Sequence, residues 1–249
     1  MITLSTIVYE GNFRKLLNSE SWFLKIKSKY ITKKRLNVNN ISSIEEFQYL
    51  LSQLNENIEI SYVDLKSQEA NQYFKLNTEI NTHGYNYIMP YFTDLLTIDT
   101  EYIFNVASDC QMDISVSDDF FEKSIKILNE DDEVLVTTIP WGHPNIFGTK
   151  YTRSAGDSEQ EHADSIDNNR NHSIKRSDDF WFSKTFSDQV FIAKIDQLRK
   201  TDFTIISNLH PYPSYGGLSF EMRLGNNLMV NNKYRAIIKS NDYYSHGKD

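Results

Sequence analysis

The hydrophobic residues of the first 140 positions form short continuous runs that alternate with longer segments of helical spacing. The first run, ITLSTIVY at 2–9, is β-branched and almost wholly apolar, which is typical of a strand covered on both faces. A polar break follows it, and then apolar residues at helical spacing. This alternation predicts a parallel α/β sheet.

The same order recurs along this part of the chain. Serine caps and acidic first turns indicate where two of the helices begin, after Ser42 or Ser43 and after Ser117. Further strands are expected at 34–38, 58–63, 101–107 and 133–139. The other helices are expected near residue 13, at 67–76 and at 85–96, where Pro90 is tolerated or causes a kink.

The pattern changes after residue 140. From 149 to 179 the chain is polar, and a loop of this length inside a compact domain is usually either functional or disordered. Apolar residues return at Phe180, and 187–198 is predicted to be a helix. A length of 249 residues permits one large domain or two small ones, and we expect one.

The charge balance limits the choice of partners. With 34 acidic and 26 basic residues the net charge is -8, so we expect no nucleic-acid partner. The stretch KIKSKYITKKR at 25–35 is locally basic. It is interpreted as a solvated helix face and turn, with phosphate binding or peripheral contact to an anionic membrane as the alternative.

Cysteine content and hydropathy indicate the compartment. A single cysteine excludes an internal disulfide, and there is neither a leader-like N-terminus nor an uninterrupted apolar run of about 18 residues. We therefore expect a cytoplasmic protein, with the inner face of the membrane as the alternative if the basic stretch binds there.

Polar side chains follow the predicted strands at their carboxyl ends, where ligands bind in open parallel sheets. They are suited to contacts with a base, a ribose or a metal ion, and they therefore favour a nucleotide site over an apolar pocket. These residues are Tyr9, Glu10, Asn39, Asn40, Asp64 and Asp109.

Neither glycine-rich phosphate loop, GxxxxGK[ST] or GxGxxG, follows the first strand. A bound diphosphate therefore needs another source of positive charge. Mg²⁺ or Mn²⁺ binds to one or two carboxylates and to phosphate oxygens, and Asp109 at the end of a strand is placed to hold such an ion.

The segments TIVYEG, NVNNISS, THGYNY and EYIFNVASDCQM, in this order, resemble the nucleotide-sugar-binding half of GT-A glycosyltransferases, especially family 2. The resemblance implies a GT-A fold, Rossmann-like, with a mostly parallel central sheet flanked by helices. It implies one domain over 1–249, with a donor-binding half at 1–140 and an acceptor-binding half at 141–249.

The resemblance also implies a set of donor contacts. The residues that it assigns to the nucleotide sugar are Val8, Tyr9, Glu10, Asn39, Asn40, Gly84, Tyr85, Ser108 and Asp109. In the family's DxD-type motif the last acid holds the metal, and Asp109 matches it, whereas Ala107 replaces the first acid. Asn39 or Asn40 replaces the acid that contacts the base, which leaves the base open.

The second half supplies candidates for the remaining roles. By resemblance in position, Glu221 is the base that deprotonates the acceptor, with a capping or salt-bridging glutamate as the alternative. His246 resembles a C-terminal metal ligand, with an exposed and inert histidine as the alternative. Trp141 and His143 are placed to contact an acceptor sugar, although core packing is an equal interpretation of Trp141. Gly216 and Gly217 indicate a turn or a close backbone approach to the acceptor.

These features together predict a glycosyltransferase that uses Mn²⁺ or Mg²⁺, inverts the anomeric centre and transfers a sugar from a nucleotide-sugar donor to a saccharide or lipid-linked acceptor. A surface polysaccharide or glycolipid pathway is the usual setting of the family. A catalytically inactive GT-A-like binding module and a nucleotidyltransferase are the alternatives.

Overall fold

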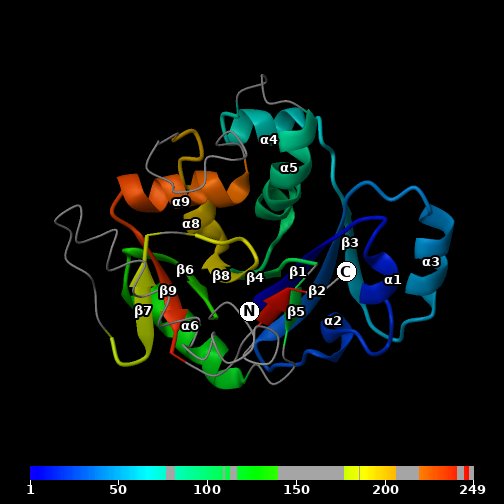
Figure 1. The fold of residues 1–249 in the computed structure, drawn as a ribbon, viewed down its shortest axis with the longest axis horizontal. Helices are drawn as coiled ribbons and strands as arrows, with labels where there is room; N and C mark the ends of the chain where they lie inside the picture. Colours follow the sequence, from blue (N-terminus) through cyan, green and yellow to red (C-terminus); the bar gives the residue numbers. More distant parts are fainter. Residues whose placement is uncertain are drawn as a thin grey trace.

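The computed structural model describes residues 1–76, 82–108, 110–112, 117–139, 177–184, 186–205, 219–239 and 244–246, with the backbone alone at 82–87, 111–112 and 244–246. Within these ranges eight strands form one sheet in the order β3-β2-β1-β4-β8-β6-β9-β7 (Figure 1). They are β1 (Ile2–Val8), β2 (Ile31–Val38), β3 (Ile58–Tyr62), β4 (Tyr102–Val106), β6 (Val134–Thr138), β7 (Phe180–Ser183), β8 (Val190–Lys194) and β9 (Tyr234–Ile238). A separate pair joins β5 (Cys110–Met112) to β10 (Tyr244–His246).

The central sheet is mostly parallel, as the sequence predicts. Strand β1 runs parallel to β2 and β4, β2 runs parallel to β3, and β6 runs parallel to β9. Two strands run in the opposite direction: β8 pairs antiparallel with β4 and β6, and β7 pairs antiparallel with β9. Strand β6, from the first 140 residues, therefore lies between β8 and β9, which come from the rest of the chain.

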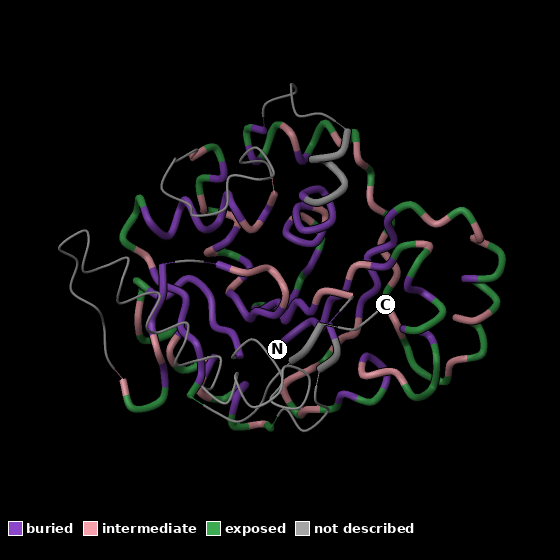
Figure 2. Tube along the Cα trace, viewed as in Figure 1, coloured by how far each residue is buried: buried purple, intermediate pink, exposed green. Residues whose placement is uncertain are grey.

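Helices cover both faces of this sheet, and each face has its own apolar core (Figures 1 and 2). The helices of the first face are α1 (Phe13–Leu16), α2 (Trp22–Lys25), α3 (Ile44–Ser52) and α6 (Asp118–Glu130). Those of the second face are α4 (Gln68–Tyr73), α5 (Thr82–Thr97), α8 (Ile195–Arg199) and α9 (Phe220–Val230). The near-continuous apolar runs of the strands follow from this burial on both sides.

The prediction of a helix over 187–198 is wrong. The segment instead forms strand β8, and only its last residues enter helix α8. The side chains of Val190, Phe191 and Ile192 are all buried, at 1%, 1% and 0% exposure, because β8 is inserted between β4 and β6 with helices on both faces. The neighbouring strands therefore determine that this sequence, which is compatible with a helix or a strand, forms a strand.

The predicted caps of two helices have the right place but a different chemistry. Ser43 is the N-cap residue of α3 and Ser117 that of α6, yet neither hydroxyl accepts a hydrogen bond from its helix. Just before α3 the carboxylate of Glu10 accepts hydrogen bonds from the backbone N–H groups of Ser42 and Ser43, each at 3.0 Å. A side chain that follows β1 thus holds the segment that leads into α3, the third helix of this face.

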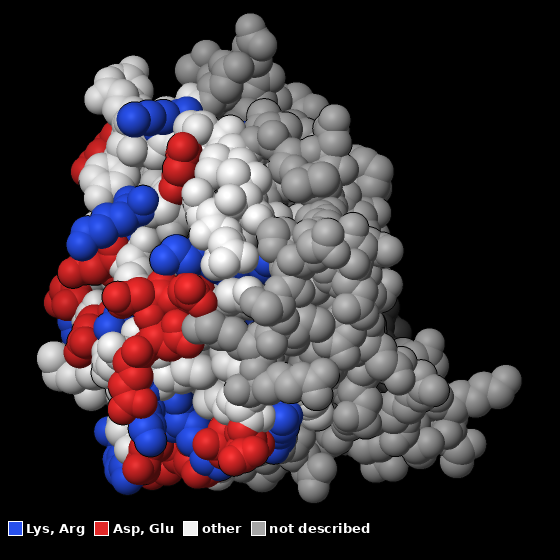
Figure 3. Space-filling view, turned by 90° about the vertical axis from the view of Figure 1, so that its left-hand side faces the viewer, with Lys and Arg blue, Asp and Glu red and all other residues white. Residues whose placement is uncertain are grey.

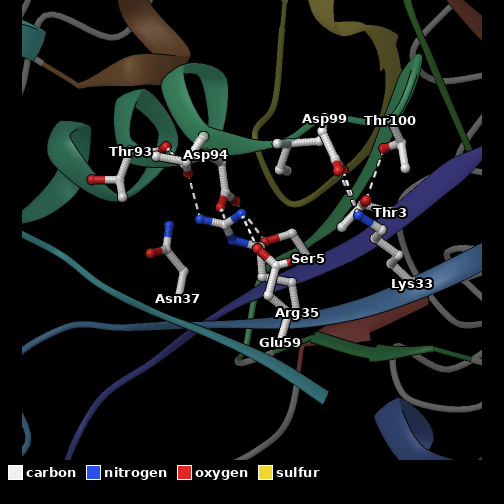
Figure 4. Close-up of polar contacts among 12 residues, drawn as sticks. Thr3, Ser5, Lys33, Arg35, Asn37, Glu59, Thr93, Asp94, Asp99 and Thr100 are labelled. Carbon is white, nitrogen blue, oxygen red and sulfur yellow. Dashed lines mark hydrogen bonds and ion pairs between the residues drawn. The ribbon is translucent and has the colours of Figure 1, made fainter. Parts of the chain in front are cut away.

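A buried polar cluster fixes α5 on the sheet (Figure 4). The Nε atom of Arg35 on β2 lies 3.1 Å from the Oδ1 atom of Asp94 on α5, and both side chains are 2% exposed. The same guanidinium forms an ion pair with Glu59 of β3 at 2.7 Å and donates to the Thr97 hydroxyl. The Ser5 hydroxyl of β1 donates to the other Asp94 oxygen at 2.5 Å. Three strands therefore contact one helix through a single charged cluster.

Charged residues of both signs lie side by side on the described surface. Over α6 and the start of β7, Lys and Arg side chains are interspersed with Asp and Glu, and Lys123 pairs with both Asp119 and Asp179 (Figure 3). In the basic stretch 25–35, ion pairs occupy four cations, namely Lys25, Lys33, Lys34 and Arg35. No helix among the described residues is long and apolar enough to cross a membrane.

Candidate active site

The carboxyl ends of β1 and β2 bring several predicted donor residues together. The backbone N–H of Asn39 donates to the carbonyl of Val8 at 2.7 Å, so the two strand ends stay paired beyond the strands themselves. Val8 is fully buried and Asn39 is 8% exposed, whereas the ring of Tyr9 is an exposed aromatic at 42%. Asn40 has a φ of 56°, a conformation that asparagine tolerates better than most residues and that turns the chain away from the edge.

Glu10, another predicted donor contact, has its carboxylate engaged within the protein. Besides the backbone N–H groups of Ser42 and Ser43, the carboxylate accepts hydrogen bonds from the hydroxyl groups of the same residues, at 3.0 Å from Ser42 and 2.8 Å from Ser43. These hydrogen bonds stabilise the ionised form, and they lower the pKa of Glu10 to about 2. Arg14 lies 3.3 Å from the same carboxylate.

The end of β4 turns sharply at the DxD-like segment. The N–H of Ala107 donates to the carbonyl of Gln189 at 2.6 Å, and the N–H of Cys110 donates back to the carbonyl of Ala107 at 3.0 Å. Asp109 itself lies outside the described residues, but Ser108 before it and Cys110 after it are placed at this edge. Cys110 is buried, at 1% exposure.

The C-terminal strand β10 reaches the same place. Its antiparallel pairing with β5 sets the backbone of His246 opposite Cys110, the residue next to Asp109. Asp109 and His246 were assigned to one metal site from sequence, and the backbone of His246 pairs with the residue that follows Asp109. Among the residues whose side chains the structure describes, no group of three or more His, Cys, Asp or Glu residues is able to hold a metal ion.

Two carboxyl groups lie beside this turn. Glu221 is in the first turn of α9, whose N-cap Ser219 accepts a hydrogen bond from Met222 at 3.2 Å. Asp188 lies just before β8, and its backbone carbonyl accepts from the Asn105 side chain of β4 at 3.1 Å. The strand order, with β8 next to β4, brings Asp188 to the edge that carries Ala107 and Cys110, whereas Glu221 comes from helix α9.

The environment of this acid pair favours a bound proton. Burial and then the nearby charge of Asp188 raise the pKa of Glu221 to about 8, against an opposing effect of the Arg235 guanidinium. Arg235 comes from β9 and is 5% exposed. The pair therefore combines one carboxyl group that holds a proton at neutral pH with a second acid beside it, an arrangement found at sites of proton transfer.

Three residues at the acid pair were not predicted as site residues from the sequence: Asp188, Tyr91 and Arg235. Asp188 lies two residues before the apolar run VFIA, as Asp109 lies two residues after the run YIFNVA, and this acid at a strand boundary was the available signal. It was missed because the segment was assigned to a helix. Tyr91 and Arg235 gave no local signal, since a tyrosine inside a helix and an arginine in an apolar strand are equally compatible with structural roles.

The other predicted residues divide into two groups. Gly84 and Tyr85 lie in the first turns of α5, where the structure describes the backbone only. The predicted acceptor residues and the polar loop fall outside the described residues: Trp141, His143, Gly216, Gly217 and the larger part of 149–179.

Grooves of about 580 and 550 Å³ lie in the described part of the chain, but at the amino ends of the strands. The first is lined by Lys34 and Glu56, which pair with each other at 2.8 Å, among other residues. The second lies beside Leu135 at the start of β6 and Asn227 near the end of α9. Neither groove is lined by the acid pair or by a predicted donor residue. The acid pair and the ends of β1 and β2 lie at the opposite edge of the sheet.

Solved structures show what this fold is. No protein-family model matches the sequence, and no curated protein is similar to it at a significant level. The S. aureus TarS 1–349 chain in complex with UDP aligns with 100% of this chain and 60% of its own, at 13% identity and a TM-score of 0.52. A longer S. aureus TarS chain aligns over 99% of this chain and 36% of its own, at 14% identity and a TM-score of 0.51.

A glucosyl-3-phosphoglycerate synthase from Mycobacterium tuberculosis, in complex with Mn²⁺, UDP and glucosyl-3-phosphoglycerate, aligns with 100% of this chain and 72% of its own, at 8% identity and a TM-score of 0.48. The present chain spans 36% and 60% of the length of the two TarS chains. The likeness to TarS, together with the mostly parallel sheet flanked by helices, confirms the GT-A fold that the sequence predicts.

Proposed function

We propose that this chain is a glycosyltransferase that transfers a sugar from a nucleotide-sugar donor to a saccharide or lipid-linked acceptor. The observation that carries the proposal is the acid pair Asp188 and Glu221, which lies beside the Ala107–Cys110 turn at the carboxyl edge of a GT-A sheet. On this proposal, donor binding and proton transfer take place at one edge of the sheet. A hexose or related sugar in polysaccharide synthesis at the cytoplasmic side is the setting that we infer.

The donor nucleoside is proposed to bind across the ends of β1 and β2. The exposed ring of Tyr9 offers an aromatic face for a base, and Asn39 and Asn40 offer amide groups for hydrogen bonds. S. aureus TarS, whose fold this chain shares, binds UDP. We therefore propose a nucleoside diphosphate sugar as the donor class, with the first turns of α5, at Gly84 and Tyr85, completing the site.

A divalent cation, Mn²⁺ or Mg²⁺, fits the residues at the end of β4. The backbone of His246 pairs with Cys110, the residue after Asp109, and carboxylate, imidazole and phosphate oxygen are suitable ligands for such ions. We propose that Asp109 and His246 hold it. When bound, the ion stabilises the negative charge of the departing diphosphate.

The reaction that this arrangement favours is a direct displacement. The acceptor hydroxyl oxygen bonds to the anomeric carbon as the bond from that carbon to the diphosphate oxygen breaks, and the hydroxyl proton passes to the carboxylate of Glu221. The nucleoside diphosphate leaves, and the configuration of the anomeric carbon is inverted. Since Glu221 accepts a proton only when ionised, and its pKa is about 8, the rate should rise with pH and level off above about 8.

Nucleotide binding is the first test. UDP, GDP and CDP are titrated with and without Mn²⁺ while the thermal unfolding of the protein is followed. A ligand at about 100 times its Kd should raise the Tm by roughly 5–10 °C for a chain of this size. Asp109→Ala should abolish the metal-dependent part of the increase, whereas Asp132→Ala, an exposed acid at the opposite edge, should keep it. No response to any of the nucleotides contradicts the proposal.

Turnover then separates the transferase from the alternatives. Hydrolysis of a labelled nucleotide sugar, or its transfer, distinguishes an enzyme from a binding module, for which the absence of the first acid at Ala107 is the argument. Glu221→Gln should bind the donor like the wild type and lose about 10²–10⁴-fold in transfer, the usual contribution of a general base. Unchanged transfer in this variant would remove Glu221 as the base.

A further inference from the structure

One tyrosine contacts both segments that carry the acid pair. The hydroxyl of Tyr91 on α5 donates to the Oδ2 atom of Asp188 at 2.9 Å. Its ring stacks on Phe220, the residue before Glu221, with ring centroids 4.4 Å apart and planes 10° apart. Tyr91 is 5% exposed, so both contacts are made in the interior. The side chain of Tyr91 therefore lies between the start of α9 and the residues that precede β8.

The sheet holds this tyrosine in place. The side-chain amide of Asn37 on β2 donates to the carbonyl of Pro90, directly before Tyr91, at 2.5 Å. One turn later the Arg35 and Asp94 ion pair fastens the same helix to β2 (Figure 4). The proline removes one hydrogen bond of the helix itself, so these contacts from the sheet replace part of what fixes α5 at this point.

The charged groups that face the Tyr91 hydroxyl determine its chemical state. Burial raises the pKa of Tyr91 well above its ordinary value, and Asp188, Glu221 and Cys110 act in the same direction. The hydroxyl therefore stays protonated at every pH at which the protein is used, and it is available as a donor. An ionised carboxylate accepts a hydrogen bond of this kind more strongly than a protonated one does.

We propose that Tyr91 is a positioning residue whose hydroxyl holds Asp188 as the ionised member of the acid pair and so leaves the proton on Glu221. The charge of Arg235 on β9 favours the ionised form of Glu221 and thus a proton on Asp188. The hydrogen bond from Tyr91 opposes this shift because it stabilises the ionised form of Asp188. The role of Tyr91 in transfer rests on the proposed function, in which Glu221 accepts the proton of the acceptor.

The test compares Tyr91→Phe with Tyr102→Phe. The first variant keeps the ring that stacks on Phe220 and removes only the donor to Asp188. The second is a matched control, because the buried Tyr102 hydroxyl donates to Asn129 at 2.8 Å, away from the acid pair. Carboxyl ¹³C resonances of labelled aspartate and glutamate are followed against pH by NMR, with Asp188→Asn and Glu221→Gln for assignment.

In the wild type the Glu221 signal should titrate at a higher pH than the Asp188 signal. In Tyr91→Phe the proton affinity of Asp188 should rise about tenfold, the effect of losing one hydrogen bond to a charged group. Tyr102→Phe should leave both signals as they are. An Asp188 midpoint that is the same in Tyr91→Phe and in the wild type overturns the proposal, whether or not the protein is a transferase.

Kinetics supply the second readout. Tyr91→Phe should move the midpoint of the pH dependence of kcat to lower pH, because Glu221 ionises more readily when Asp188 holds the proton. The KM of the donor should stay unchanged, since the hydroxyl acts on the acid pair and not on the nucleotide. If Tyr91→Phe does not fold, Asp188→Asn carries the test: the Glu221 midpoint should fall in this variant, and an unchanged midpoint overturns the proposal. Absence of turnover in the wild type rejects the proposed function, while the NMR result still decides the role of Tyr91.

Discussion

Asp94 is a carboxyl group whose burial outweighs its partner. The side chain is 2% exposed and forms an ion pair with Arg35, yet burial raises its pKa from an ordinary 3.8 to about 6. The Arg35 charge and the Ser5 hydrogen bond act in the opposite direction without cancelling the effect. The cluster is therefore explained better as a device that fixes α5 on three strands than as a source of stability.

This shift gives a pH dependence with a definite sign. A folded pKa above the unfolded one means that the folded state binds more protons between pH 4 and 6, so stability should fall as pH rises through this window and change little above it. Through Asp94 alone, the free energy of unfolding should fall by roughly 3 kcal/mol as the pH rises through this window. Asp94→Asn should remove this slope, as measured by urea unfolding at a series of pH values.

Asp99→Asn is the control for this prediction. Asp99 is an exposed acid whose pKa is lowered, first of all by its hydrogen bond to Lys33, so its removal should affect the pH dependence in the opposite sense. Equal slopes between pH 4 and 6 in the wild type and in Asp94→Asn contradict the assignment.

At the scale of elements, the start of α3 depends on a residue that belongs to another segment. The Glu10 carboxylate accepts the backbone N–H groups of Ser42 and Ser43, the two residues directly before the helix, and so fixes the point at which α3 begins. Glu10→Ala should therefore increase the hydrogen exchange of amides at 42–47, and leave those of α6 unchanged. Glu20→Ala, which removes only the exposed pair with Lys25, is the control. Equal exchange at 42–47 in all three proteins contradicts this role.

The elements also show how far the sequence determines the fold. Most of the strands and helices up to residue 139 were predictable, because their apolar runs are buried on both faces and their helices begin at caps. The contact between Glu10 and the start of α3 was not predictable, since Glu10 is 33 positions before Ser43 and no local sequence pattern connects the two residues. Strand β8 was missed because its conformation is set by β4 and β6 on either side.

The same limit applies to the candidate site. Asp109 and Glu221 were identified by their place in a resemblance, and the ends of β1 and β2 by the geometry of parallel sheets. The meeting of Asp188 with Glu221 was not predictable, because it follows from the insertion of β8 beside β4. Tyr91 joins the site through a hydrogen bond to a residue 97 positions away.

At the scale of the molecule, the first 139 residues depend on the rest of the chain. Strand β8 lies between β4 and β6 in the sheet and pairs with both. The apolar core over α5 is likewise shared, since Phe92 packs against Phe203 with centroids 5.0 Å apart and Tyr91 stacks on Phe220. A fragment that ends at residue 139 therefore leaves β4 with an open edge and α5 with an uncovered apolar face.

A fragment of residues 1–139 should consequently not fold as a unit, although it contains the proposed nucleotide residues. We expect no cooperative thermal transition by circular dichroism, strong binding of a dye for apolar surfaces, and no stabilisation by UDP. The full chain cut once between 149 and 179 is the control, because it keeps every strand of the sheet and should unfold cooperatively. A fragment that melts cooperatively and binds the nucleotide contradicts the single-domain arrangement. In that case the acid pair, half of it on β8 and half on α9, would belong to a second unit that docks on a self-sufficient donor domain.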